Sequence, residues 1–296
     1  MRTNELAARV FDFIGEHKDF PKSRATPLTG LAVHSQTSPN PLDATVYNPV
    51  VCLNLQGRKE VTVGTRSIEF GEGQSLIVSH HLPVMARVTQ ASPNRPYLAL
   101  IISLDMGIIQ ALCDEIGPPR SGDHPPRSLS VGQIDERLID TITRYFDLVA
   151  DPLEARVMAP LILKEIHFRL LTADHGEMLR QCLHRDSHAS RIARAITVIR
   201  TRYREPLAVT ALAEAAAMSP SSFHEHFRQV TGTTPLQYQK DMRLTEARQL
   251  LAADALSVSS AAFAVGYESP TQFSREYARK FGNPPRRDVH QRDSVA

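Results

Sequence analysis

The sequence predicts a chain in two parts: an all-β antiparallel barrel with flanking helices, followed by an all-α domain that holds two helix-turn-helix units. Three observations predict this fold class. Short apolar runs separated by glycines fill residues 46–104, helical patterns follow them, and one motif of the last third recurs after 50 residues. With 296 residues, 42% of them hydrophobic, the chain can form a core in each part.

The region predicted to form the barrel contains six short runs of residues that are typical of strands. They are VYNPVVCLNLQG, KEVTVG, RSIEFG, QSLIVS, PVMARV and YLALIISL, between Val46 and Leu104. Four glycines punctuate them: Gly57, Gly64, Gly71 and Gly73. This spacing is typical of a small antiparallel barrel or jelly roll, a fold that often encloses a ligand.

Three helical patterns follow the barrel, at Met106–Ile116, Ile134–Ala150 and Leu153–Thr172. A proline-rich loop, GPPRSGDHPPRS, separates the first two. The polar segment after them has the composition of a connection between domains. We therefore predict four parts: a barrel domain with its helices at 1–172, a linker at 173–190, a helical domain at 191–288 and a tail at 289–296.

The helical domain contains an internal repeat. SPSSFHEHFRQVTGTTP at 219–235 aligns with SPTQFSREYARKFGNPP at 269–285, and each copy follows a short helix rich in alanine. In each copy a serine can cap a helix, a proline suits its first turn, and a glycine ends it. A sharp turn followed by a strongly capped second helix is typical of a helix-turn-helix.

Two further helices complete the domain. RIARAITVIRTRY precedes the first unit, and TPLQYQKDMRLTEARQLLAA, capped by Thr234, joins the two units. In the second repeated helix, Phe273, Tyr277 and Phe281 lie four residues apart and predict a buried face. The opposite face carries small polar groups and one guanidinium, which is unusual for an ordinary exposed helix.

The charge is divided unevenly between the two parts. Residues 190–296 hold 15 Lys or Arg against 10 Asp or Glu, a net charge of +5, whereas residues 1–189 hold 19 against 22, a net charge of −3. A basic helical module joined to a mildly acidic domain fits a nucleic-acid binder attached to a domain that does not touch nucleic acid. Chance is the alternative for so modest a bias.

Residues 191–288 resemble the DNA-binding domain of the AraC/XylS family of bacterial transcription regulators, and GYESPTQFSREYARKFGNPP carries the resemblance most clearly. The barrel segment resembles the cupin-like amino-terminal domain of one subgroup of that family. The resemblance implies that the linker helix holds the second helices of both units in successive major grooves of double-stranded DNA, about 34 Å apart. It also implies an activator rather than a repressor, a homodimer, and contact with RNA polymerase.

By the resemblance, nine residues face DNA. They are Ser221, His224, Glu225 and Arg228 in the first unit, Arg243 in the linker helix, and Thr271, Gln272, Ser274 and Arg275 in the second unit. Chemically, Arg275 suits guanine, Gln272 adenine and Glu225 a cytosine amine, while Arg243 suits a phosphate. The alternatives are structural: Gln272 can cap its own helix, and Glu225 can pair with Arg228.

A small-molecule effector is expected in the barrel, near Tyr47, Cys52, Arg58 and Tyr97. These residues do not identify the effector. Cys52 within VVCLNL is either a buried apolar residue or a thiol that reacts with an electrophile.

Enzymatic and membrane functions find little support in the sequence. His80 and His81 are adjacent, so on a strand their side chains point to opposite faces and cannot bind one metal ion together. The sequence also shows no metal-ligand, phosphate-loop or nucleophile motif. We therefore expect no metal, no cofactor and no catalytic residue. Charged residues near the start and the lack of a long apolar run predict a cytoplasmic protein with no membrane contact. The alternatives are a barrel enzyme or sensor whose helices bind a protein partner, and an RNA binder.

Overall fold

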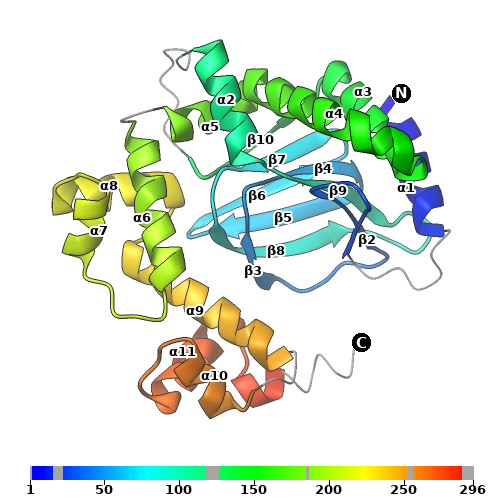
Figure 1. Cartoon of the computed structure of the whole chain (residues 1–296). Helices are drawn as coiled ribbons and strands as arrows, with labels where there is room; N and C mark the ends of the chain where they lie inside the picture. The colour runs from blue at the N-terminus through cyan, green and yellow to red at the C-terminus, as the bar shows by residue number, and fades with distance from the viewer. Residues whose placement is uncertain (1, 16–22, 118–126, 185–186, 253–255, 289–296) are drawn as a thin grey trace.

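The computed structural model describes residues 2–15, 23–117, 127–184, 187–252 and 256–288. The tail predicted at 289–296 lies outside these ranges. The described chain forms a β-rich domain with helices on one side, followed by an all-α domain, as the sequence predicts (Figure 1). None of the described helices is both long and apolar enough to cross a membrane.

In the described residues, ten strands form two antiparallel sheets that pack against each other. The first has the order β1-β2-β9-β4-β7-β10 and the second the order β3-β8-β5-β6. The strands of the first sheet are β1 (Ser23–Ala25), β2 (Leu31–Gln36), β9 (Tyr97–Ser103), β4 (Val50–Gln56), β7 (Gln74–Val78) and β10 (Leu129–Gln133). Those of the second are β3 (Asp43–Tyr47), β8 (Leu82–Gln90), β5 (Arg58–Val63) and β6 (Arg66–Gly71).

Strand β4 explains why its own predicted run, VVCLNL, is almost entirely apolar. Val51, Leu53 and Leu55 face a core beneath the helices, whereas Val50 and Cys52 face the interior between the two sheets. A strand that is buried on both faces shows no polar alternation. The helices that cover the first sheet are α1 (Arg2–Gly15), α2 (Met106–Ile116), α3 (Glu136–Asp147), the short 3-10 helix η1 (Leu148–Ala150) and α4 (Pro152–Thr172) (Figure 1).

The predicted helices after the barrel are confirmed, and 134–150 divides into α3 and η1. The predicted connection at 173–190 is not a loop. It contains η2 (Asp174–Gly176), α5 (Glu177–Leu183) and the start of α6, and Met178 and Leu179 are buried in the core beneath the helices. Helix α1 and strands β1, β2 and β10 were not predicted. Most residues of α1 are exposed or half-buried, and the three strands are short and take their structure from pairing with other strands.

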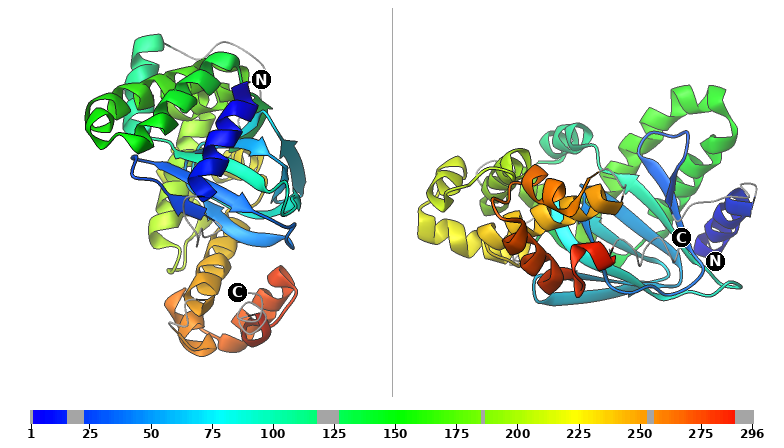
Figure 2. Two further views of the ribbon diagram at one scale, coloured as in Figure 1. Left: turned by 90° about the vertical axis from the view of Figure 1, so that its right-hand side faces the viewer. Right: turned by 90° about the horizontal axis from the view of Figure 1, so that it is seen from below.

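The all-α domain begins with α6 (His188–Arg202). The first helix-turn-helix unit is α7 (Val209–Ala215) and α8 (Pro220–Thr231), the linker helix is α9 (Pro235–Ala252), and the second unit is α10 (Val258–Ala264) and α11 (Pro270–Phe281). Figures 1 and 2 show α9 running from the first unit, beside the barrel, to the second unit below it.

The two units differ in how they are buried. The first shares one apolar core with the barrel interior: Phe223 and Phe227 of α8 belong to the same cluster as Val63 of β5 and Leu82 of β8. The second has a separate core around Phe273 and Tyr277. The barrel and the first unit are therefore packed as one body.

Polar contacts seal this shared core. Ser128 donates two hydrogen bonds to the carbonyl oxygen of Val230 at the end of α8, from its backbone N–H at 2.9 Å and from its hydroxyl at 2.7 Å. The buried ring of His80 lies between Ser128 and Ser79, with Nε2 2.8 Å from Ser128 Oγ and Nδ1 2.9 Å from Ser79 Oγ. Since the Ser128 hydroxyl already donates to Val230, Nε2 carries the proton of a neutral imidazole.

A second junction ties the barrel to the linker helix. Arg248 of α9 bonds Asp43 of the edge strand β3 and, at 2.7 and 3.0 Å, the carboxylate of Asp288. Asp288 also accepts a hydrogen bond of 2.7 Å from Tyr277 in the core of the second unit. One guanidinium therefore connects the barrel, the linker helix and the second unit.

We predict that His80 makes stability depend on pH. Burial, and the neighbouring His81, lower the pKa of His80 from 6.5 to about 3. Between these values the unfolded chain binds a proton that the folded protein does not, so stability is full above pH 6.5 and is lost as pH falls below it. Linkage gives a loss of about 2 kcal/mol between pH 7 and pH 5 from this residue.

Urea unfolding at pH 7 and pH 5 checks this prediction. His80→Gln should reduce the drop in stability between the two pH values, whereas His224→Gln, at an exposed position of α8, should leave it unchanged. Other buried histidines contribute in the same direction, so the comparison is between variants. A drop in His80→Gln equal to that of the unsubstituted protein would contradict the prediction.

Candidate DNA-binding surface and effector site

Helix α8 of the first unit separates a buried face from an exposed one. Ser219 caps it by accepting a hydrogen bond from the Ser222 N–H at 3.4 Å, and Gly232 ends it with φ +72° in the left-handed region. Phe223 and Phe227 are fully buried. The four residues that the sequence assigned to DNA, Ser221, His224, Glu225 and Arg228, are all exposed.

Helix α11 repeats this arrangement. Ser269 accepts a hydrogen bond from the Gln272 N–H at 3.3 Å, and Gly282 ends the helix with φ +80°. Of the residues predicted to face DNA, Thr271, Gln272 and Arg275 are exposed and Ser274 is half-buried. The Gln272 side chain does not return to its own cap but donates to Glu276 at 3.4 Å.

The cations on these two surfaces have no acidic partner. Among the described residues, neither Arg228 nor Arg275 has a carboxylate within 4.0 Å. The alternative pairing of Glu225 with Arg228 is therefore not formed. Both guanidiniums are available to phosphates or base edges.

Arg243 occupies a different place. Its guanidinium donates to the carbonyl oxygens of Tyr203 at 2.5 Å, Glu205 at 2.9 Å and Gly266 at 3.0 Å. Burial lowers its pKa below the ordinary value. These bonds join the end of α6 to the turn of the second unit, so the structure gives Arg243 a structural role that the sequence did not reveal.

Two ion pairs fix α11 against the linker helix. Lys280 lies 2.5 Å from Asp241, and Lys240 lies 3.2 Å from the largely buried Glu276. Tyr267, in the turn between α10 and α11, donates to the same Glu276 at 2.9 Å. The exposed face of α11 is thereby held in a defined orientation on α9.

In the barrel, three of the four predicted effector residues come together. Tyr97 Oη lies 4.0 Å from Cys52 Sγ, and Lys59 Nζ lies 5.5 Å from the ring centroid of Tyr47 and 6.0 Å from that of Tyr97. Arg58 does not join them: its side chain is 56% exposed and lies 3.8 Å from Glu69 on the outer surface. Its neighbour Lys59 takes the inward position.

The sequence contained a signal for Lys59. In KEVTV, residues two apart share a face of the strand, and Val61 and Val63 are buried in the interior. Lys59 therefore belongs to the inward set, and Arg58 to the outward one. The alternation, followed back from the two valines, thus separates Arg58 from the other three predicted effector residues.

Cys52 lies in a setting that suppresses thiol chemistry. Burial raises its pKa above the ordinary cysteine value, although Lys59 and Tyr97 oppose this shift. A buried neutral thiol is a poor nucleophile. Of the two readings of the sequence, the structure favours the buried apolar residue.

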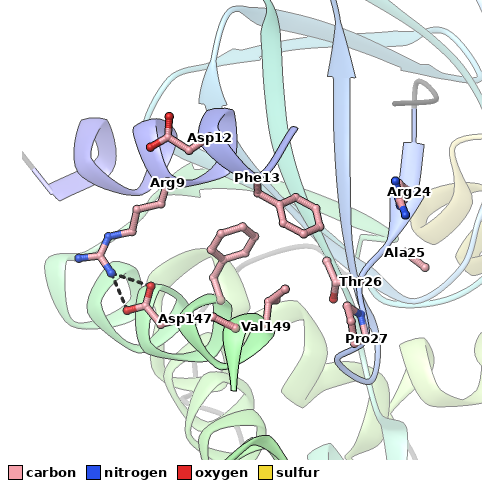
Figure 3. A pocket seen from close by; sticks show the side chains of 11 residues that line it. Arg9, Asp12, Phe13, Arg24, Ala25, Thr26, Pro27, Asp147 and Val149 are labelled. Carbon is pink, nitrogen blue, oxygen red and sulfur yellow. Dashed lines mark hydrogen bonds and ion pairs between the residues drawn. The ribbon is translucent and has the colours of Figure 1, made fainter. Parts of the chain in front are cut away.

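A hollow of about 810 Å³ lies away from these residues, between α1, β1 and the end of α3 (Figure 3). Arg9 on its wall bonds Asp147 at 2.6 Å and Glu5 at 2.9 Å, and Phe13 packs edge-on against Phe146. We assign this hollow no ligand.

Comparison with known proteins matches both domains. The sequence profile described as the N-terminus of AraC-type transcriptional regulators matches residues 27–178, about half of the chain, and a profile of a helix-turn-helix domain matches residues 212–290. Related proteins include the transcriptional regulator GlxA of Rhizobium meliloti, 38% identical over 85 residues, and the RCS-specific transcriptional activator RclR of Escherichia coli, 42% identical over 77 residues. The activator RhaS of Escherichia fergusonii is 32% identical over 105 residues.

These segments cover 29%, 26% and 36% of this chain, and only 26%, 27% and 38% of the respective relatives. Among solved structures, ToxT of Vibrio cholerae bound to an unsaturated fatty acid aligns over 88% of this chain and 95% of its own, with a TM-score of 0.56 and 8% identity. ToxT bound to (E)-4-(8-methylnaphthalen-1-yl)but-3-enoic acid aligns over 91% and 99%, with a TM-score of 0.58 and 9% identity. Identities this low show a common fold alone. Together with the match to half of the chain, the fold places this protein in the family of AraC-type transcriptional regulators.

Proposed function

We propose that the protein is a sequence-specific DNA-binding regulator of transcription whose activity depends on a small molecule in its barrel. The observation that carries this proposal is the pair of capped helices, α8 and α11, whose outward residues are exposed while their rings are buried. An α-helix fits the major groove, about 12 Å wide, when its outer side chains are small. The site of action would be the cytoplasm, where promoter DNA is found.

Within this proposal, Arg228 and Arg275 supply the strongest contacts, because both are exposed and unpaired among the described residues. Ser221, His224, Glu225, Thr271, Gln272 and Ser274 complete the two surfaces. Arg243 acts indirectly, because its three carbonyl bonds set the position of the second unit.

The barrel can influence DNA binding through the junctions that join it to the helices. Ser128 holds the end of α8, and Asp43 holds Arg248 of the linker helix. A ligand that changes the strands bearing these contacts would alter how the two units are held. The ToxT structures, which share this fold, hold a fatty acid and a butenoic acid, and this supports a small-molecule ligand for the present chain.

We further propose that the regulator activates transcription through contact with RNA polymerase. Two of the related proteins, RclR and RhaS, are described as activators. The resemblance of the helical domain to the AraC/XylS family points the same way.

A homodimer through α4 is also proposed. Leu153, Val157 and Leu161 lie four residues apart on one face of this helix and are 75%, 66% and 61% exposed. If two copies of α4 pack antiparallel about a two-fold axis at residue 159, Val157 meets Leu161 of the second copy, and Glu154 meets Lys164 of the second copy. The centre of the stripe would thus pair apolar with apolar residues and Glu154 with Lys164, which in its own chain lies 3.2 Å from Glu115.

Replacement of Arg275 tests the DNA-binding surface. On an operator selected by the unsubstituted protein from random duplexes, Arg275→Ala should raise Kd about tenfold or more, since a bidentate base contact is worth about 1–3 kcal/mol. Arg156→Ala, at an exposed position of α4 with the same change in charge, is the control and should leave Kd unchanged. Fluorescence anisotropy measures both.

The same assay run over a salt series separates this proposal from a helical domain that binds protein. The logarithm of the association constant for the duplex should fall linearly with the logarithm of the salt concentration, with a slope of about −0.9 for each phosphate contacted. Equal affinity of Arg275→Ala and the unsubstituted protein for the selected operator would count against the assigned surface.

Replacement of Leu161 tests the dimer. Leu161→Asp places a charge in the centre of the α4 stripe and should convert a dimer into a monomer in sedimentation velocity at about 10 μM, because a buried unpaired charge costs several kcal/mol. Leu42→Asp, at a residue that is 42% exposed on the barrel, should have no effect. A monomeric unsubstituted protein at that concentration would refute the proposal.

A further inference from the structure

Lys59 places a cation among the apolar residues of the barrel interior. On β5 it lies opposite Phe70 of β6 and Val88 of β8, and both of these residues are buried in the interior. Directly opposed residues of antiparallel strands project from the same face of a sheet. The Lys59 side chain therefore projects inward, between the two sheets.

The groups around its ammonium come from both sheets. The rings of Tyr47 on β3 and Tyr97 on β9 lie 5.5 and 6.0 Å from Nζ. Tyr97 contacts the thiol of Cys52 on β4 and packs edge-on against the ring of His34 on β2, with 5.7 Å between the centroids. Aromatic faces attract a cation, but they do not neutralise it.

This part of the interior carries a charge that its neighbours do not cancel. Burial raises the pKa of the Cys52 thiol and holds that of Tyr97 well above its ordinary value, so both are neutral at pH 7. Burial alone would lower the pKa of Lys59, but interactions with Tyr47 and Cys52 raise it, so the ammonium stays charged. Among the described residues, no carboxylate lies within 4.0 Å of Nζ.

The Lys59 side chain is half-buried. A cation withdrawn from water without an anion is costly, and a well-packed apolar residue in its place is often more stabilising. Such a group is commonly retained for a function. The strand needs no lysine for its own pairing, because Val61 and Val63 fill the next two inward positions with apolar side chains.

We propose that Lys59 is the anchor of the effector site and that the effector is a small organic monocarboxylate, its carboxylate on the Lys59 ammonium and its apolar body against Tyr47, Tyr97 and the interior valines. This inference deepens the proposed function, on which it rests. One lysine balances one negative charge, whereas a phosphate dianion would leave excess charge in an apolar interior. An amine ligand would face repulsion from the ammonium.

The tyrosines give the site a second feature. Tyrosine hydroxyls can donate hydrogen bonds to a carboxylate oxygen, and the thiol of Cys52 lies beside that of Tyr97. Tyr47 belongs to the strand β3, which also carries Asp43, the partner of Arg248 in the linker helix. Occupation of the site would thus act directly on the strand that holds the linker helix.

The test measures binding of a fixed probe set by isothermal titration calorimetry. The probes are octanoate, benzoate and phenylacetate, with octanol, benzyl alcohol and octylamine as uncharged and cationic counterparts. We expect at least one carboxylate to bind the full-length protein more tightly than its uncharged counterpart, and octylamine not to bind. Lys59→Met should lower the affinity for that carboxylate about 10- to 100-fold, and Lys59→Arg should lower it less.

Arg58→Met is the matched control. It removes the same charge from the neighbouring residue, whose side chain lies on the outer surface, and should not change carboxylate affinity. In the absence of any probe, Lys59→Met should raise the melting temperature, because it removes the uncompensated ammonium. Arg58→Met should leave the melting temperature unchanged.

Three results would overturn the inference: no carboxylate of the set binds the unsubstituted protein, carboxylate affinity is equal in Lys59→Met, or Lys59→Met lowers the melting temperature. Binding of the selected operator is measured for each variant in parallel. If one of these results is found and DNA binding is retained, the proposed anion site is refuted but the proposed regulator is not. If the unsubstituted protein does not bind DNA, the proposed function itself is refuted.

Discussion

The structure depends on one apolar core that runs without interruption from the barrel interior into the first helix-turn-helix unit. Side chains from β5, β7 and β8 and from α6, α7 and α8 belong to the same buried cluster. The domain boundary in the sequence is therefore not a boundary in packing. Any change in the volume or position of the inner barrel side chains reaches the buried face of α8 through close-packed contacts, which are stiff.

The second unit is connected differently. Its core around Phe273 and Tyr277 is separate, and it reaches the rest of the molecule through α9 and a few polar contacts, chiefly those of Arg248 with Asp43 and Asp288. Such contacts are easier to exchange than a buried apolar interface. The chain thus combines one unit that is packed rigidly against the barrel with another whose position rests on charged groups, which salt and ligands can influence.

Features that depend on residues close together in the sequence could be predicted, whereas features that depend on distant residues could not. The serine, proline and glycine that bound α8 and α11 act within one turn, and the structure has these helices as predicted. Strand β10 could not be found, because its partner β7 lies some fifty residues away and its own sequence, LSVGQ, is weakly apolar. Arg243 has the appearance of a surface cation, and only the three-dimensional arrangement shows the three carbonyls it serves. Lys59 was within reach of the alternation of its strand, whereas its tyrosine neighbours required the topology of both sheets.

Strand β3 lies at the edge of its sheet, where β8 is its partner among the described strands. Its five residues carry Tyr47 at one end and Asp43 at the other. If an effector binds beside Tyr47, this short strand couples effector binding to DNA binding. Thermodynamic reciprocity then requires each ligand to change the affinity of the protein for the other by the same factor. The promoter would then be an allosteric ligand of the barrel: the regulator bound to its operator would sense a different concentration of effector from the regulator free in solution.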